Sequence, residues 1–75
     1  MPEVIIYAVE GRSHEQKQGL VRDITDACVR HLGAPEEAVV IQFVECPPSS
    51  KSKGGILFSD MTKEDRQRIF KPGER

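Results

Sequence analysis

Two short runs of residues are apolar on both faces, and they constrain the fold more than any other feature. Residues 4–9 (VIIYAV) are all apolar or aromatic, and residues 38–45 (AVVIQFVE) repeat the pattern with Gln42 as the internal exception. Such runs are too short for helices, and they lack the alternation of a strand with one face in water. The sequence therefore predicts two strands that are covered on both faces.

An amphipathic helix is predicted between these strands, over about residues 14–32. Ser13 and Gln16 have the spacing of a capping box, while Gly33 and then Pro35 mark the end of the helix. Apolar side chains recur along it at helical spacing and form one stripe: Val21, Ile24, Cys28 and Leu32.

Strand, helix and strand in this order predict an α/β fold. It is a β-α-β unit with a parallel two-stranded sheet and a right-handed crossover. One helix covers only one face of such a sheet, and the other face would meet water as an exposed apolar patch. A chain of 75 residues also buries only about 60% of its unfolded surface. We therefore expect a homo-oligomer in which a second copy completes the sheet.

The whole chain, residues 1–75, is predicted to be a single domain with a core at residues 2–46. A loop follows at residues 46–55, with two prolines, three serines and two glycines. In the tail, residues 56–75, a short strand is expected at 56–58. Thr62 and Asp65 predict a second capped helix at about residues 63–70, ended by Pro72-Gly73.

Composition excludes several classes of function. Eleven Lys and Arg residues against twelve Asp and Glu give a net charge of −1, which provides no basic patch for nucleic acid or membrane. No apolar run approaches the ~20 residues of a membrane helix, and the first residues do not resemble a signal peptide. Two cysteines, Cys28 and Cys46, are too few for a disulfide scaffold or a zinc site. We expect a soluble, cytoplasmic protein.

Few residues suggest catalysis. The sequence has no Gly-rich phosphate loop, no metal-spaced His/Cys cluster and no GxSxG motif. His14 and His31 are interpreted as surface or structural residues. Glu10 and Glu45 each follow a predicted strand, and a carboxylate pair formed by them remains open.

The pair Met1-Pro2 is the most informative candidate. Removal of Met1 would leave Pro2 with a secondary amine, which is both a base and a nucleophile. Free α-amino groups titrate near ~7.7–8, and burial or a neighbouring cation such as Arg12 would lower the pKa further. Such a base suits proton abstraction next to a carbonyl group.

Around Pro2, the sequence resembles the 4-oxalocrotonate tautomerase family. The resemblance covers about residues 1–60. It is carried by four motifs: Met1-Pro2, Glu-Gly-Arg-Ser-x-Glu-Gln-Lys at residues 10–17, Leu-x-Ala-Pro at residues 32–35 and Gly54-Gly55.

This resemblance implies a tautomerase that needs neither a metal nor a cofactor. Pro2 would move a proton within a small anionic 2-hydroxydienoate or 2-keto acid, and Arg12 would bind the substrate carboxylate. The resemblance further implies a homodimer, usually assembled into a trimer of dimers.

The sequence departs from the family at two candidate pocket positions. Val40 stands where the family has its second arginine, and Lys51 stands where it has a pocket aromatic; Tyr7 is the third candidate pocket residue. Lys51 or Lys53 could supply the missing charge, although the interpretation of both as solvated loop lysines is favoured. Two alternatives stay open: a hydratase or dehalogenase on unsaturated 3-halo acids that uses Glu10 or Glu45 to activate water, and a non-catalytic oligomer. Cys28, in place of a catalytic histidine in related dehalogenases, weighs against the first.

Overall fold

The computed structural model describes residues 1–70, and it divides into two compact units. The first unit is Met1–Glu45, and the second begins at Cys46. The single domain expected from the sequence stays a prediction, and each unit is considered separately below. The predicted helix end at Pro72-Gly73 lies outside the described residues.

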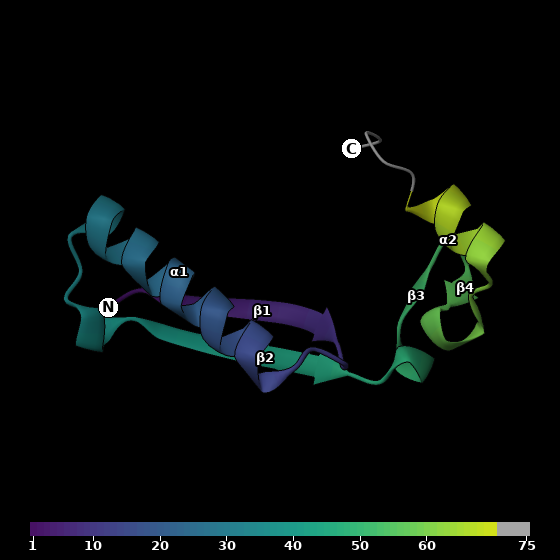
Figure 1. The fold of residues 1–75 in the computed structure, drawn as a ribbon, viewed down its shortest axis with the longest axis horizontal. Coiled ribbons are helices and arrows are strands. Elements are labelled where there is room, and N and C mark those ends of the chain that lie inside the picture. The colour runs from purple at the N-terminus through teal and green to yellow at the C-terminus, as the bar shows by residue number, and fades with distance from the viewer. Residues whose placement is uncertain (71–75) are drawn as a thin grey trace. The chain divides into compact units, whose positions relative to one another are not determined.

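The first unit is a β-α-β unit, as the sequence predicts. Strand β1 (Glu3–Val9) is followed by helix α1 (His14–Leu32), a 3₁₀ turn η1 (Glu36–Ala38) and strand β2 (Val40–Cys46). The two strands pair side by side and run in the same direction, and α1 crosses one face of this sheet (Figure 1). Strand β2 begins two residues later than predicted, because residues 36–38 close into the 3₁₀ turn directly after Pro35.

One backbone hydrogen bond fixes how the strands are aligned. The Val40 N–H donates to the Pro2 carbonyl oxygen over 3.0 Å, which sets Glu3 opposite Val40 in a parallel ladder. Exposure then alternates in step on both strands. Ile6 and Phe43 are half-buried on the side of α1, whereas Ile5 and Tyr7 are exposed on the other side.

Helix α1 has the two caps that the sequence predicts. The Ser13 hydroxyl accepts from the Gln16 backbone N–H, and the Gln16 side chain accepts from the Ser13 N–H at 2.8 Å. At the other end Gly33 adopts φ 69°, and its N–H donates to the Val29 carbonyl. The helix bounds therefore follow from local hydrogen bonding alone.

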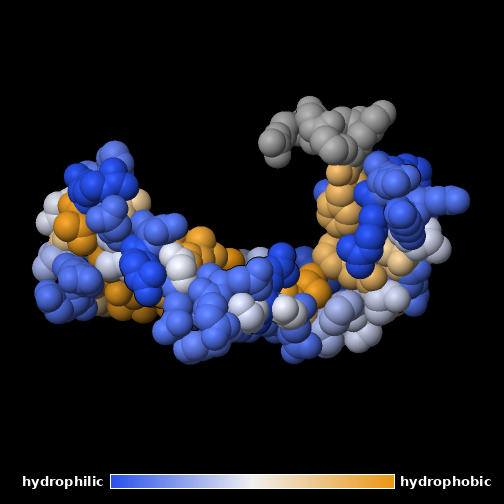
Figure 2. Space-filling view, viewed as in Figure 1, coloured by the Kyte–Doolittle hydropathy of each residue, from blue (hydrophilic) through white to orange (hydrophobic). Residues whose placement is uncertain are grey.

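The described residues do not form a closed core. Not one side chain of residues 1–70 is fully buried, and large apolar residues on both the sheet and the helix are exposed. Figure 2 shows apolar surface on the first unit, including the end where α1 finishes and β2 begins. Apolar area left in water forfeits about 25 cal/mol per Å², so the isolated chain leaves much of its hydrophobic stabilisation unused.

The second unit contains a small hairpin and a short helix. A 3₁₀ turn η2 (Pro48–Ser50) leads into strand β3 (Ser52–Lys53), which pairs antiparallel with β4 (Ile56–Leu57). The sequence predicted only an irregular loop before residue 56, because a two-residue strand leaves no periodic pattern. Phe58 starts a further 3₁₀ turn, η3 (Phe58–Asp60), instead of continuing the strand.

Helix α2 (Lys63–Ile69) packs on this hairpin through its last residues. Ile69 approaches Gly54, the Phe70 ring meets Phe58 edge-on at 5.8 Å between centroids, and the Lys53 ammonium lies 4.6 Å from the Phe70 centroid. At its start, Thr62 and Asp65 form the predicted capping box. Hydrogen bonds from Thr62 hold the pKa of Asp65 below its ordinary value, and Arg68 acts in the same direction.

Neither helix of the described residues combines the length and the apolar character that crossing a bilayer requires.

We expect two glycine substitutions in the first unit to have opposite effects on stability. Gly33 has positive φ, so Gly33→Ala should lower the free energy of unfolding by about 1 kcal/mol. Gly19 lies inside α1, and a Cβ there would meet nothing within 4 Å, so Gly19→Ala should raise it by ~0.5–1 kcal/mol. Denaturant unfolding at one protein concentration measures both. A stability that is unchanged or raised by Gly33→Ala would contradict the assignment of Gly33 as the cap.

Candidate active site

Pro2 lies at the entrance to β1, held on a rigid element. Its carbonyl accepts the hydrogen bond from Val40, so the residue is tied to the first residue of β2. Pro2 itself is half-buried, whereas Met1 before it is 89% exposed. Removal of Met1 would therefore take away an exposed residue and leave the proline nitrogen on an anchored strand.

An apolar hollow lies beside Pro2. Its volume is about 610 Å³, within the range of ~300–1,000 Å³ that small-molecule sites occupy. The hollow lies where the end of α1, the following turn and the start of the chain meet. Its lining residues are Met1, Pro2, Leu32, Ala34, Pro35 and Ala38.

Arg12 lies just beyond the other end of β1. Gly11, at φ 131°, turns the chain after the strand, and the Arg12 Nη1 donates to the Val9 carbonyl over 2.9 Å. Among residues 1–70, no carboxylate lies within salt-bridge distance of this exposed guanidinium. It does not form the surface pair with Glu10 or Glu15 that would explain it as structural, so its charge is available to an anion.

Pro2 and Arg12 do not meet within one chain. The seven residues of β1 separate them, which at about 3.3 Å per residue places them roughly 20 Å apart. A small keto acid cannot span that distance. Because an extended strand carries its two ends far apart, an Arg12 that lies beside the Pro2 nitrogen cannot belong to the same chain, and their proximity stays a prediction for an assembly of chains.

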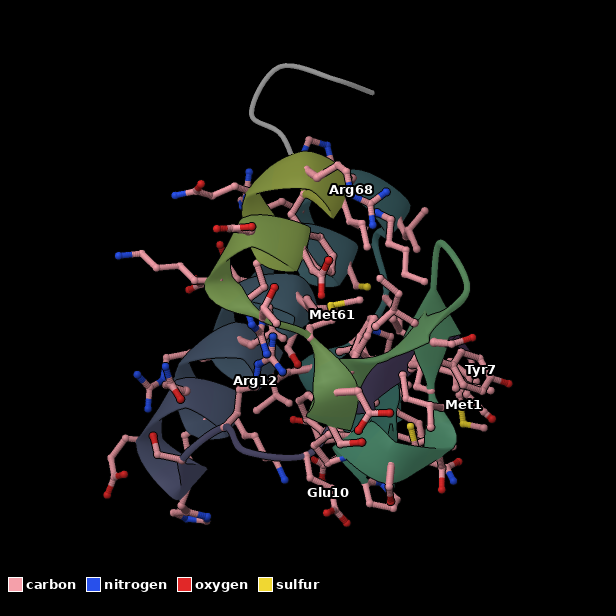
Figure 3. All side chains as sticks on the ribbon, turned by 90° about the vertical axis from the view of Figure 1, so that its right-hand side faces the viewer. Met1, Tyr7, Glu10, Arg12, Met61 and Arg68 are labelled. Atoms are coloured by element: carbon pink, nitrogen blue, oxygen red, sulfur yellow. The ribbon has the colours of Figure 1, made fainter. Side chains whose placement is uncertain are left out.

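Of the candidate pocket residues, the structure brings only Val40 next to Pro2. Tyr7 is 70% exposed and points away from α1, as Figure 3 shows in a view along the strands. It lies four residues along β1 from Glu3, about 13 Å away. Val40 and Tyr7 thus share the exposed sheet face but do not line one pocket in a single chain.

Lys51 and Lys53 both belong to the second unit and differ in their surroundings. The Lys53 ammonium lies over the Phe70 ring and makes a cation–π contact with it, so this lysine contributes to packing within the second unit. Lys51 is half-buried, and its carbonyl accepts from the Phe58 N–H at 2.9 Å. Of the two lysines, only Lys51 has no described aromatic partner and stays a candidate for binding an anion.

The two glutamates proposed to activate water are in different situations. Glu45 accepts a 2.5 Å hydrogen bond from the Lys17 ammonium, which also lies 5.5 Å from the Phe43 centroid. Both side chains of this pair are partly buried, so the Glu45 carboxylate makes a structural contact that joins β2 to α1. Glu10 is exposed at the end of β1. Among the described residues, Glu45 therefore forms a structural ion pair with Lys17, whereas the sequence left open a catalytic carboxylate pair of Glu45 with Glu10.

Comparison with known proteins identifies the family. The family model for tautomerase enzymes matches residues 2–61. The chain belongs to the tautomerase family. A 2-hydroxymuconate tautomerase of Pseudomonas putida is 42% identical over 63 residues, covering 84% of this chain and all of the relative. A probable tautomerase of Bradyrhizobium diazoefficiens is 52% identical over 58 residues, which are 77% of this chain and 87% of the relative.

Solved structures agree with the sequence relatives. The crystal structure of a 4-oxalocrotonate tautomerase homologue superposes with a TM-score of 0.78 at 37% identity, covering 83% of this chain and 98% of that one. A heterohexameric 4-oxalocrotonate tautomerase from Chloroflexus aurantiacus gives 0.75 at 32%, covering 83% of this chain and all of that one. The resemblance to the 4-oxalocrotonate tautomerases is thus confirmed, and the protein is a tautomerase, an isomerase.

Two features of this tautomerase were not foreseen in detail. The hollow beside Pro2 is walled by the Leu-x-Ala-Pro motif of residues 32–35, which drew attention as a family signature and not as a binding surface. Helix α2 begins after residue 61, where the family match ends. Its contacts with the hairpin are therefore an addition to the part of the chain that the family shares.

Proposed function

We propose that this tautomerase interconverts the enol and keto forms of a small 2-hydroxydienoate or 2-keto acid, with the amino group of Pro2 as general base. The observation that carries the proposal is the placement of Pro2. It is anchored by Val40, beside an apolar hollow, and preceded by one exposed methionine. The 2-hydroxymuconate tautomerase relative supports this class of substrate.

The proton balance of the reaction is closed within the site. The neutral secondary amine takes the proton from the enol hydroxyl, and the resulting dienolate shares its charge between the C2 oxygen and the alternate carbons C3 and C5 of the chain. The protonated amine then returns the same proton to carbon, which completes the keto acid. A guanidinium that donates to the carboxylate or the carbonyl oxygen stabilises the charge that develops between these steps.

The guanidinium that performs this role has to come from another copy of the chain. Arg12 of the same chain lies roughly 20 Å from Pro2, as the length of β1 dictates. Self-association removes this difficulty when it brings the Arg12 end of β1 in one chain beside the Pro2 end of β1 in a neighbouring chain. We infer that the enzyme is a homo-oligomer, from a dimer up to a trimer of dimers.

The sheet supports self-association independently of catalysis. The face opposite α1 exposes Ile5, Tyr7, Val40 and Val44, a concentration of apolar side chains that usually marks an interface. The heterohexameric relative shows that this fold assembles in at least one case.

The two alternatives receive less support. Hydration or dehalogenation of an unsaturated acid needs a carboxylate that activates water. Glu45 is already paired with Lys17, which leaves Glu10 as the one candidate of the two. A non-catalytic oligomer leaves unexplained why Arg12 has no carboxylate partner among residues 1–70. Turnover of 3-haloacrylates by the processed protein, without enol turnover, would favour the first alternative. Absence of both activities would favour the second.

We expect the chain to be oligomeric at micromolar concentration. Light scattering coupled to gel filtration should give a mass of at least two chains, and a stable mass near 8.4 kDa would contradict the proposal. Ile5→Asp should weaken the assembly, because it places a charge in the exposed apolar face. Gln18→Asp adds the same charge on the exposed surface of α1 and serves as the matched control.

We expect catalysis to require a free Pro2 nitrogen, because an amide nitrogen is not basic. Protein that retains Met1 should be folded and inactive, whereas processed protein should turn over an enol substrate. The kcat/KM of the processed form should rise with pH as the amine loses its proton. Both forms are checked by mass and assayed side by side. Equal activities would eliminate the proline mechanism.

We expect Arg12→Ala to lower kcat/KM by about ten- to a hundredfold, since charge-assisted hydrogen bonds are lost. The loss should be repaired in mixed oligomers. Chains that carry Arg12→Ala and a free Pro2 are exchanged with chains that keep Arg12 but retain Met1. Because each chain supplies what the other lacks, part of the activity should return. No recovery, after subunit exchange is verified by mass, would contradict the supply of Arg12 by a neighbouring chain.

A further inference from the structure

We propose that the ion pair between Lys17 and Glu45 positions Arg12, and that these two residues are therefore positioning residues for the reaction. The pair acts in the chain that supplies the guanidinium and not in the chain that supplies Pro2. The inference rests on the proposed function, since it concerns how Arg12 is presented to the substrate.

The segment that carries Arg12 has little packing of its own. Residues 10–16, from the end of β1 through the first turn of α1, are all exposed. Exposed side chains bury little apolar surface, so packing within the segment does not hold it in place. Its position depends on the elements at its two ends, which are β1 and α1.

Lys17 is the first residue of α1 that contacts the sheet. It is half-buried, and its backbone N–H donates to the carbonyl of Ser13, the residue after Arg12, over 3.1 Å. Its ammonium donates to the Glu45 carboxylate and lies over the Phe43 ring. Both of these partners belong to β2. The start of α1 is thus fastened to the strand that pairs with β1.

This pair differs from the other side-chain contacts of residues 1–70. The remaining hydrogen bonds and ion pairs between two side chains link positions no more than four residues apart. The pair of Lys17 with Glu45 spans 28 positions. Its side chains are only 31% and 23% exposed, so water screens their attraction less than it screens a fully exposed pair.

The pair closes a ring of contacts that contains Arg12. The helix α1 starts on the side where both strands end (Figure 1), and the pair joins α1 to β2 there. Strand β2 pairs with β1, and Arg12 is bonded back to β1 through the Val9 carbonyl. Breaking the pair loosens the helix side of this ring. An error of about 1 Å in a group that binds the reacting molecule can lower a rate on the order of a hundredfold.

The first experiment measures kcat/KM for 2-hydroxymuconate in processed protein. Lys17→Met keeps an unbranched side chain and removes its charge, and it should lower kcat/KM at least about fivefold. When Arg12→Ala is already present, the further loss should be less than about twofold, because the pair acts through Arg12. Arg30→Met is the matched control. It breaks the pair with Asp26, which lies within α1 alone, and should leave kcat/KM within about twofold of the wild type.

An exchange of the two charges tests whether the contact itself matters. Lys17→Glu combined with Glu45→Lys rebuilds the pair with its ends exchanged, and a glutamate near the start of α1 suits the helix dipole. The combined variant should be at least about threefold more active than Lys17→Met. A folded combined variant that is no more active than Lys17→Met would overturn the proposal, because the lysine and not the contact would then explain the loss.

Mixed oligomers identify the chain in which the pair acts. The reference mixture contains chains with Arg12→Ala and a free Pro2, and chains that keep Arg12 and retain Met1. Lys17→Met is then added to one kind of chain at a time. We expect a loss of at least about fivefold when it is in the chain that supplies Arg12, and of less than about twofold in the chain that supplies Pro2. Equal losses would overturn the inference, because the pair would then only support the fold.

Failure of this inference is distinguishable from failure of the proposed function. Full activity of Lys17→Met, or a loss that stays undiminished beside Arg12→Ala, would overturn the positioning role alone. An unchanged kcat/KM in Arg12→Ala would refute the proposed role of Arg12 and this inference with it. If the reference mixture shows no recovery, the comparison beside Arg12→Ala still decides. If Lys17→Met does not fold, Glu45→Gln keeps the shape of the side chain, weakens the pair and is measured in the same way.

Discussion

The packing of one helix on one face of a two-stranded sheet governs everything else in this molecule. Helix α1 covers Ile6 and Phe43, and the Lys17–Glu45 pair joins it to β2. It leaves Ile5, Tyr7, Val40 and Val44 in contact with water. A chain this short has no further helix in the same unit with which to cover them. The proposed association with another copy would bury that face, and the same association would bring Arg12 of one chain to Pro2 of another.

The parts of the fold set by local rules were predictable from the sequence. The ends of α1 follow from Ser13 and Gly33, and the start of α2 follows from Thr62 and Asp65, because each cap is a hydrogen-bonding pattern within four residues. The β3–β4 hairpin was not predicted, since strands of two residues have no period to detect. The late start of β2 was missed because the turn at residues 36–38 has no glycine to mark it.

The candidate site shows a different limit. Pro2 and Arg12 were recognisable as chemical groups, but their distance from one another is a property of β1 and of the assembly, which composition and spacing do not encode. The hollow is likewise formed by the start of the chain and by the connection between α1 and β2, so only the folded chain brings Leu32 and Ala38 to Pro2. The pairing of Glu45 with Lys17, 28 positions apart, was beyond sequence reasoning for the same reason.

The length of β1 also bears on how such enzymes diverge. When the base and the cation of one active site come from different chains, a single gene must preserve both residues, although each chain needs only one of them at a given site. Gene duplication relaxes that requirement, because one descendant can lose its amino-terminal proline and the other its arginine while their mixed assembly keeps working sites. If the seven-residue strand β1 divides the site between chains as proposed, it opens a route from an enzyme of identical subunits to one of two obligate, non-identical subunits.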